Sequence, residues 1–489
     1  MNNGCCIQNT YKYAADKDER ILFMNDILTK INDTMYTYIL LVLLAGAGIY
    51  FTVRTKGVQL RLLGDGLKCM LEKAPEGKNG EKKVSSFQAL MISTASRVGT
   101  GNIAGIATAI AAGGPGAVFW MWVMAVIGGA SAFVESTLAQ IYKVKEGGQF
   151  RGGPSYYMQK ALGKRWLGIL FSISLIICFA YGFNGLQAFN ISSSLEYYIP
   201  NYTSTNIPVI LGLILAAATA AVIWGGVHRI GFITSVMVPV MAGIYILIGI
   251  WAMVTHAGQL PAVFATIFKN AFDFQAMAGG MAGSAVVIGI KRGLFSNEAG
   301  MGSAPNASAS ADVDHPVKQG LVQVISVFID TLLICSSTAM MLLVSGIQGE
   351  SGVMDGIPYV QAAIKANVGS WGIHFITFSI FAFAFSSLIG NYYYAESNIL
   401  FIKNNKALLN IFRVTCVIAI FLGAQADFSL MWNVADITMG IMAIINILSI
   451  LLLGGTAVKA LRNYEQQKKS GQKIRFRGED IGVKDTIWK

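Results

Sequence analysis

Charged residues are scarce in this sequence. Of its 489 residues, 13% are Asp, Glu, Lys or Arg, whereas 54% are hydrophobic. Soluble proteins carry about 25% charged residues, so this chain has too little polar surface to stay in water at its size. The composition therefore excludes a soluble globular protein and predicts a membrane protein.

Metal-binding and catalytic patterns are also missing. The six cysteines have no framework spacing, the four histidines are scattered, and there is no HExxH motif, Ser/His or paired-Asp constellation, or cofactor loop. Gly99-x-Gly101-x-x-Ala104 has the letters of a dinucleotide fingerprint, but that motif must follow a strand in a βαβ unit, and this one lies in an apolar helical segment. We therefore expect no enzyme, no metal centre and no cofactor.

Long apolar blocks fill most of the chain. A helix of about 20 apolar residues crosses a bilayer core of about 30 Å, and eleven such blocks are present, at 35–53, 86–111, 117–141, 167–195, 207–224, 231–254, 276–290, 320–345, 371–402, 409–425 and 429–456. The stretch 355–368 is too short and polar to span and reads as an interfacial helix. The predicted fold class is all-α and polytopic, with an N-terminal extension at 1–34, a transmembrane domain at 35–456 and a basic tail at 457–489. No cleavable signal peptide is expected, because residues 1–34 lack an apolar core.

The net charge of the chain is +11, and the basic residues behind it are not spread evenly along the sequence. If the loop 54–83 is cytoplasmic and the chain alternates, nearly all Lys and Arg residues lie on the cytoplasmic side, including Lys291 and Arg292, and the opposite loops hold only Lys269 and Lys365. This positive-inside bias predicts a cytoplasmic C-terminus and an outer N-terminus. Four basic residues in the N-terminal tail are the exception. The bias explains the charge without nucleic acid as a partner.

Eleven spans divide into one peripheral helix, 35–53, and a core of ten at 86–456. Ten helices split into five and five, and because five is odd the second half would enter the membrane inverted. Transporters of this kind bind substrate on discontinuous helices, which appear in sequence as Gly-interrupted segments at matching positions of the two halves. Gly99–Gly105 in the first half and Gly279–Gly283 in the second fit that pattern.

The glycines at 99, 101 and 105 make local unwinding cheap, because glycine is poor in helix interiors. An unwound segment at mid-membrane needs a polar ligand or buried protein around it. The half-helix starting near Asn102 would offer N–H groups and a positive dipole end to a carboxylate, and the carbonyls before it would suit a cation. Close helix packing through small residues is an equally good reading of the spacing alone.

Several polar residues lie inside predicted spans. Arg97 would be costly without a partner, by at least about 3 kcal/mol, and Glu135, Glu298 and Asp330 are the candidates, whether for a gate or for a buried structural ion pair. Ser386 and Ser387 either bond back to their own helix or complete an oxygen shell for a hard cation. Asp330 is a candidate second cation or proton site, or a paired structural charge. Gln187 could hydrogen-bond a substrate or a neighbouring helix.

Three long motifs resemble the alanine/glycine:cation symporter family: SRVGTGNIAGIATAIAAGGPGAVFWMWVMAVIGGASAFVESTLAQ at 96–140, GQFRGGPSYYM at 148–158 and RGLFSNEAGMGSAPNASA at 292–309. The resemblance covers roughly residues 35–456. It implies the inverted-repeat fold of the leucine transporter preceded by one extra helix, a prokaryotic plasma membrane, and symport of alanine or glycine with a cation, usually Na⁺.

Residue roles follow from the resemblance where motifs match. Thr100, Gly101 and Asn102 match the unwound point that holds the substrate carboxylate, and Gln187 matches a substrate-contacting glutamine. Ala95 and Val98 match the positions whose carbonyls bind sodium, and Ser386 and Ser387 match the two hydroxyls that complete that ion site, which shifts the interpretation of this serine pair toward the ion.

The chain departs from the family at Asn391. Many members have Gly-Trp-Ser-Tyr-Tyr-Gly-Glu where this sequence reads Gly-Asn-Tyr-Tyr-Tyr-Ala-Glu, at 390–396. If the tryptophan shapes a tight pocket for a methyl side chain, Asn391 makes a roomier and more polar one. We therefore hypothesise that serine or glutamine is accepted as well as alanine and glycine.

The predicted function is import of small neutral amino acids with Na⁺ by alternating access, in a lipid bilayer and without an obligate protein partner. H⁺ coupling through Asp330 or Glu298 is the alternative within this class. An ion channel is a rival class, but channels usually gather a pore from several symmetric subunits, whereas here ten core helices lie in one chain.

Overall fold

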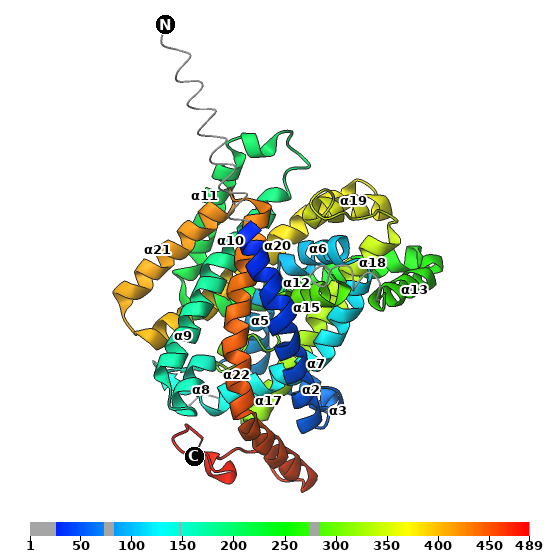
Figure 1. The fold of residues 1–489 in the computed structure, drawn as a ribbon. Helices are drawn as coiled ribbons and strands as arrows, with labels where there is room; N and C mark the ends of the chain where they lie inside the picture. Colours follow the sequence, from blue (N-terminus) through cyan, green and yellow to red (C-terminus); the bar gives the residue numbers. More distant parts are fainter. Residues whose placement is uncertain (1–25, 73–82, 147, 274–283, 489) are drawn as a thin grey trace.

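The computed structural model describes residues 26–72, 83–146, 148–273 and 284–488, most of them helical (Figure 1). The first helix runs from Asp26 to Arg54 and contains a π-helical stretch, η1 (Met35–Leu40), before α2 (Leu41–Arg54). Two short helices follow, α3 (Val58–Arg61) and α4 (Leu63–Leu71). The first helix therefore begins inside the predicted extension 1–34, of which residues 1–25 lie outside the described part.

The first half of the core contains the expected discontinuous helix. Its segments are α5 (Ser86–Arg97), the 3-10 turn η3 (Thr100–Asn102) and α6 (Ala104–Gly113). The long helices that follow are α7 (Gly116–Ile141), then α9 (Arg165–Ile176), η4 (Ile177–Phe183) and α10 (Asn184–Ser193) in one continuous run, then α11 (Ile207–Ile223) and α12 (Gly226–Thr255).

The second half begins in the described part with α15 (Ala285–Asn297), because residues 274–283 lie outside it. The predicted glycine break at 279–283 therefore lies outside the described residues. The other long helices are the continuous run α17 (Pro316–Phe328), η8 (Ile329–Cys335) and α18 (Ser336–Val344), then α20 (Trp371–Ile402), α21 (Lys406–Gly423) and α22 (Phe428–Lys469). The predicted span 371–402 matches α20 residue for residue, whereas α22 continues past the predicted end at 456.

Short elements connect the long helices. They are the antiparallel hairpin β1 (Val144–Glu146) and β2 (Gln149–Arg151), with α8 (Pro154–Lys160), η5 (Tyr202–Ser204), η6 (Ala257–Gln259), α13 (Leu260–Ala271), α16 (Pro305–Ser308), α19 (Gly356–Val368) and η9 (Gly478–Ile481). The predicted interfacial helix 355–368 is α19. Local chemistry fixes several starts: Ser85 and Gln88 form a reciprocal capping box at the start of α5, and Asp427 caps α22.

Eight of the described helices are long and apolar enough to cross a membrane. The three predicted spans outside this group are the divided helix 86–111, the 17-residue α11 and the partly described span 276–290. The total of eleven spans therefore stays a prediction, while the polytopic all-α class is confirmed.

The long helices stand side by side in one bundle (Figure 1). Helix α7 packs against α2, α15, α17 and α22 within this bundle. We call the end of the bundle where α22 ends, together with α3 and α8, the tail face, and the other end, with α6 and α19, the opposite face (Figure 1).

Close packing of α7 on α17 depends on a glycine. A Cβ atom at Gly320 would lie 2.8 Å from the carbonyl oxygen of Phe133 and would collide with the Thr137 hydroxyl. We expect Gly320→Ala to destabilise the bundle by about 1–3 kcal/mol, the usual cost of overpacking, measured as a lower thermal unfolding midpoint in detergent. Gly46→Ala is the control, since nothing lies within 4 Å of that position. Equal midpoints for the two variants would contradict this packing.

Candidate substrate and cation site

The backbone of the break between α5 and α6 is held in place by hydrogen bonds to side chains, most of them from other helices. The Gly99 amide donates to Oδ1 of Asn102 at 3.1 Å, and the Thr100 amide donates to Oε1 of Gln187 at 3.0 Å. Asn190 donates to the Thr100 hydroxyl at 2.8 Å, and the Thr338 hydroxyl donates to the carbonyl oxygen of Asn102 at 2.6 Å. Backbone groups that lose helical partners in an apolar medium need such replacements.

Four predicted cation ligands meet at the end of α5. The Ser386 hydroxyl lies 3.4 Å from the carbonyl oxygen of Ala95 and 3.5 Å from that of Val98. The Ser387 hydroxyl lies 3.0 Å from the Ala95 oxygen. All four residues have 0% exposure. The structure thus brings together two hydroxyls of α20 and two carbonyls of α5, neutral oxygen ligands of the kind that hard cations prefer.

A second polar cluster surrounds Asn102 and Asp330. Asn102 Nδ2 lies 2.7 Å from Asp330 Oδ1 and 3.2 Å from Ser296 Oγ. The Ser296 hydroxyl donates to Asp330 Oδ2 at 2.5 Å, as does the Thr331 hydroxyl at 3.1 Å. Asp330 lies in the π-helical stretch η8, a local widening often found at functional sites. The predicted substrate contact Asn102 and the predicted second cation site Asp330 are therefore neighbours.

Asn391 also lies beside the break, but its amide is engaged by protein groups. Its Oδ1 accepts from the Ser96 hydroxyl at 2.7 Å, and its Nδ2 donates to Asn184 Oδ1 at 3.0 Å. Ser96 directly follows Ala95, one of the two residues whose carbonyl oxygens are predicted cation ligands. A substrate side chain that binds Asn391 would therefore exchange its hydrogen bonds with these partners.

Arg97 is buried to 2% exposure, and none of its three guanidinium nitrogens has a hydrogen-bond partner among the residues that the structure describes. Its charge interacts electrostatically with Glu135, Glu298 and Asp330, yet each of these carboxyl groups takes its hydrogen bonds from other residues. The expected ion pair is thus a set of longer-range interactions. Three carboxyl groups around one guanidinium leave an excess of acidic groups beside the break.

Two glycines at the break admit close neighbours. A Cβ atom at Gly99 would collide with the Ser387 hydroxyl, and one at Gly101 would lie 2.5 Å from the Phe295 ring. The Phe295 ring packs against Phe183 and Trp432, with centroids 4.8 and 5.2 Å away. The lack of a side chain at Gly99 therefore lets the predicted cation ligand Ser387 come close, and the lack of one at Gly101 lets the Phe295 ring come close.

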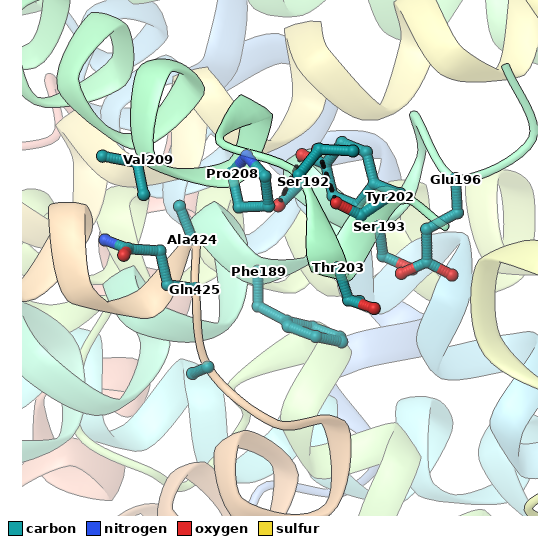
Figure 2. Close-up of a pocket in the computed structure, with 12 residues that line it drawn as sticks. Phe189, Ser192, Ser193, Glu196, Tyr202, Thr203, Pro208, Val209, Ala424 and Gln425 are labelled. Atoms are coloured by element: carbon teal, nitrogen blue, oxygen red, sulfur yellow. Dashed lines mark hydrogen bonds between the residues drawn. The ribbon is translucent and has the colours of Figure 1, made fainter. Parts of the chain in front are cut away.

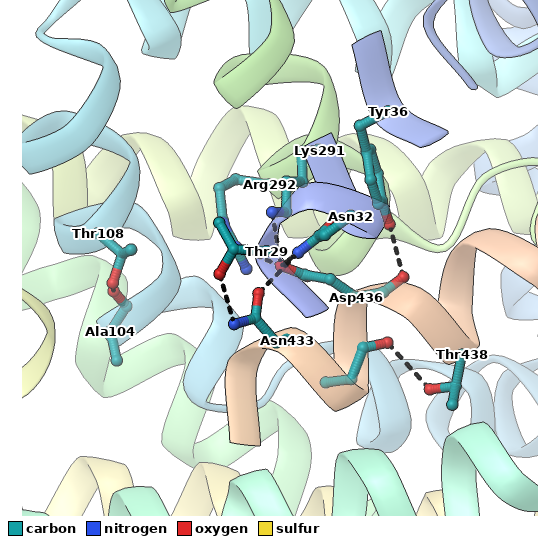
Figure 3. A network of polar contacts seen from close by, with 11 residues as sticks. Thr29, Asn32, Tyr36, Ala104, Thr108, Lys291, Arg292, Asn433, Asp436 and Thr438 are labelled. Carbon is teal, nitrogen blue, oxygen red and sulfur yellow. Dashed lines mark hydrogen bonds and ion pairs between the residues drawn. The ribbon is translucent and has the colours of Figure 1, made fainter. Parts of the chain in front are cut away.

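Sequence reasoning missed a charged cluster nearer the opposite face, shown in Figure 3. Asp436 Oδ2 pairs with Arg292 Nη2 at 2.7 Å and with Lys291 Nζ at 2.9 Å. Asn32 and Tyr36 of the first helix also bond to Asp436. The placement of Lys291 and Arg292 in a cytoplasmic loop was therefore wrong: both lie buried within α15. Asp436, an acid inside an apolar block, was the available signal.

A pocket of about 230 Å³ lies away from the break (Figure 2). Its lining comes from the end of α10, the segment 202–208 and the α21–α22 loop, and includes Phe189, Ser193, Glu196, Tyr202 and Gln425. None of the predicted site residues lines it. The polar side chains among the predicted site residues are between 0% and 3% exposed. This conformation therefore closes the break to solvent.

A helical bundle with a broken helix whose polar groups meet at its centre defines a membrane transporter of the leucine-transporter fold. The fold matches the crystal structure of MhsT in complex with L-phenylalanine with a TM-score of 0.55, over 84% of this chain and 95% of that one, at 15% sequence identity.

The chain belongs to the sodium:alanine symporter family, whose model matches residues 21–478. It is 46% identical over 467 residues to the amino-acid carrier protein AlsT of Bacillus subtilis (strain 168), covering 95% of this chain and 97% of that protein. It is 47% identical over 441 residues to the probable sodium/glutamine symporter GlnT of the same organism, covering 90% and 91%. The expected family and the absence of an enzyme role are thereby confirmed.

The contact between Gly101 and Phe295 can be tested directly. We expect Gly101→Ala to lower amino-acid uptake into proteoliposomes by at least about tenfold, because a 1.4 kcal/mol distortion of the break already has that effect. Gly105→Ala, on the next turn, is the control: its nearest neighbour, Trp432, would lie 3.5 Å away, an ordinary contact. Partial rescue of Gly101→Ala by Phe295→Leu would locate the cause in the ring, and normal uptake by Gly101→Ala alone would contradict the assignment.

Proposed function

We propose that this protein imports small neutral amino acids together with Na⁺ by alternating access, with the break between α5 and α6 as the binding site. The observation that carries the proposal is the convergence of the Ala95 and Val98 carbonyls with the Ser386 and Ser387 hydroxyls. The family supports Na⁺ as the coupling ion and an amino acid as the cargo.

Binding of the ion and of the substrate is coupled through α5. In the closed structure the serine hydroxyls donate to the carbonyls, so an arriving Na⁺ would replace those hydrogen bonds with ion contacts. These carbonyl groups lie directly before Gly99 and Thr100 in the chain. The amides of Gly99 and Thr100 are in turn positioned by Asn102 and Gln187. An ion that fixes the end of α5 therefore also fixes the groups that would hold the substrate, which raises affinity reciprocally for both ligands.

The substrate carboxylate would lie at the start of α6. Backbone N–H groups and the positive end of a helix dipole favour an anion there. The excess of buried carboxyl groups around Arg97 favours the cation and the substrate ammonium group. One coupled charge contributes about 2.3 kcal/mol at 100 mV, which corresponds to about 50-fold accumulation.

The tail face would be cytoplasmic. The positive-inside bias favours that side for the end of α22, the hairpin β1–β2 and α8, and the bacterial relatives support the plasma membrane of a prokaryote. Inward transport runs from the opposite face through the break to the tail face.

Na⁺ coupling predicts a specific defect in the serine pair. We expect Ser386→Ala and Ser387→Ala to raise the Na⁺ concentration for half-maximal uptake by at least about tenfold, since losing one oxygen ligand costs on the order of 1.4 kcal/mol. Ser379→Ala is the matched control, because Ser379 lies on the same helix and donates to the Phe375 carbonyl of that helix. Unchanged uptake after replacement of Na⁺ by choline at fixed pH would exclude sodium and favour H⁺ coupling through Asp330.

Asn391 predicts the range of substrates. The similarity to a probable glutamine symporter supports acceptance of glutamine as well as alanine, glycine and serine. We expect excess glutamine or serine to inhibit uptake of labelled alanine, and Asn391→Trp to abolish inhibition by glutamine while alanine uptake persists, because the larger ring fills the space for a longer side chain. Absence of inhibition in the unmodified protein would remove this hypothesis.

A further inference from the structure

The segment after α22 folds back against the tail face as a defined structure. Gln467, near the end of α22, accepts from the Arg475 amide at 2.8 Å and donates to the Arg475 carbonyl at 2.7 Å. The Gly478 amide donates to the carbonyl of Trp488 at 3.1 Å, which closes the segment into a loop. In Figure 1 it lies directly beneath the bundle, beside the C-terminus. The basic tail predicted at 457–489 is therefore partly helix and partly this docked segment.

Two aromatic residues dock the segment onto the bundle. The Phe476 amide donates to the carbonyl of Asp314 at 3.0 Å, and its ring meets the edge of His315 with centroids 5.0 Å apart. The Trp488 indole donates to the carbonyl of Gln140, at the end of α7, at 2.9 Å. Lys473, Arg475 and Arg477 are exposed while Phe476 is buried, so apolar and hydrogen-bonding groups, and not the basic side chains, make this contact.

Trp488 also packs against a small apolar cluster that includes the start of the broken helix. The cluster consists of Ala89 on α5 with Ala311 and Val313 in the connection to α17, and Val84, just before α5, packs against it as well. The Asp312 amide donates to the carbonyl of Val84 at 3.0 Å, and Lys83 pairs with Asp312 at 2.7 Å. The tail thus covers the junction between the start of α5 and the α16–α17 connection, while the indole hydrogen bond ties the same side chain to α7.

Lys143 completes the contact. This side chain is 1% exposed; its ammonium donates to the Ala311 carbonyl at 2.7 Å and lies 4.1 Å from the Phe150 ring centre and 4.9 Å from that of Trp488. Burial lowers its pKa to about 7. The charged form therefore depends on the carbonyl and on the two rings, one of which the tail supplies.

The position of this contact matters because α5 carries the cation ligands. Every residue of α5 from Ala89 to Arg97 is buried, so a path from the break to the tail face requires α5 to move away from its neighbours. Movement of the start of α5 separates Val84 and Ala89 from Ala311 and Val313, and so takes apart the cluster against which Trp488 packs. We propose that residues 470–488 are a latch on the tail face that keeps the start of α5 closed and must release it before the site opens inward.

The latch rests on the orientation given under the proposed function, in which the tail face is the side of release. It goes beyond that function because it assigns a conformational role to a segment remote from the ligands. One indole hydrogen bond, one cation–π contact and a few apolar neighbours form a contact that can break and re-form within a transport cycle.

Reversible cross-linking tests whether release is required. In a cysteine-free background shown to retain uptake, Val84→Cys and Trp488→Cys are bridged with a bis-methanethiosulfonate reagent. We expect the bridge to lower alanine uptake by at least about tenfold, a 1.4 kcal/mol effect, and dithiothreitol to restore it. Gln467→Cys with Arg475→Cys is the matched control, because that bridge ties the tail only to its own helix. Normal uptake through the Val84–Trp488 bridge, or equal arrest by both bridges, overturns the latch.

A second measurement needs no substrate. With Ser93→Cys as a reporter on the buried part of α5, we expect Trp488→Ala to speed labelling by a maleimide at least about fivefold, equivalent to about 1 kcal/mol. Trp166→Ala removes a tryptophan that is 62% exposed on α9 and should leave labelling unchanged. Equal rates with and without Trp488 overturn the latch. Faster labelling in a protein that imports no amino acid under any condition would retain the latch and reject the proposed function instead.

Discussion

The meeting of α5 with α20 at the middle of the bundle is the contact on which the rest of the site depends. A helix that stops at mid-membrane exposes carbonyl oxygens, and in an apolar surrounding each one needs a partner. Ser386 and Ser387 provide those partners for the end of α5, at distances of 3.0–3.5 Å. Because hydroxyls and carbonyls are also good ligands for a hard cation, the same atoms that make the break tolerable without an ion make it receptive to one.

The other side of the break is stabilised by amide side chains. Gln187, Asn190 and Asn102 satisfy the backbone between α5 and α6, and Asn102 in turn reaches Asp330 on another helix. The proposed ion ligands and the proposed substrate ligands are therefore joined through only a few residues of unwound chain. This short connection gives a physical basis for coupling, since neither ligand can order its groups without ordering those of the other.

Charge is distributed unequally along the molecule. Among the described residues, the three carboxyl groups around Arg97 form no direct ion pair with it, whereas Asp436 is paired with both Lys291 and Arg292. Burial of charge is expensive unless it is compensated, so the compensated cluster is suited to holding helices α15 and α22 together. At the tail face, Trp488 packs against the apolar cluster that contains the start of α5.

Local sequence features were enough to predict the class of the protein, the approximate ends of most long helices and the position of the break. These follow from local properties: apolar length, glycine density and capping residues such as Ser85 act over one or two helical turns. The serine pair shows the limit of such local reasoning. Spacing alone favoured hydrogen bonds back to the serines' own helix. Both serines do donate to Phe383 of that helix, but they also bond to the end of α5, which spacing could not predict.

Which distant groups meet became evident from the folded bundle alone. The fold puts Lys291 and Arg292 against Asp436, leaves Arg97 without a hydrogen-bonding partner among the described residues, engages Asn391 with Ser96 and Asn184, and packs Trp488 against the cluster at the start of α5. Each of these contacts joins residues far apart in the chain, and no local pattern specifies them. The physical reason is that helix formation is governed by near neighbours, whereas the partners of a buried polar group are set by how the whole bundle packs.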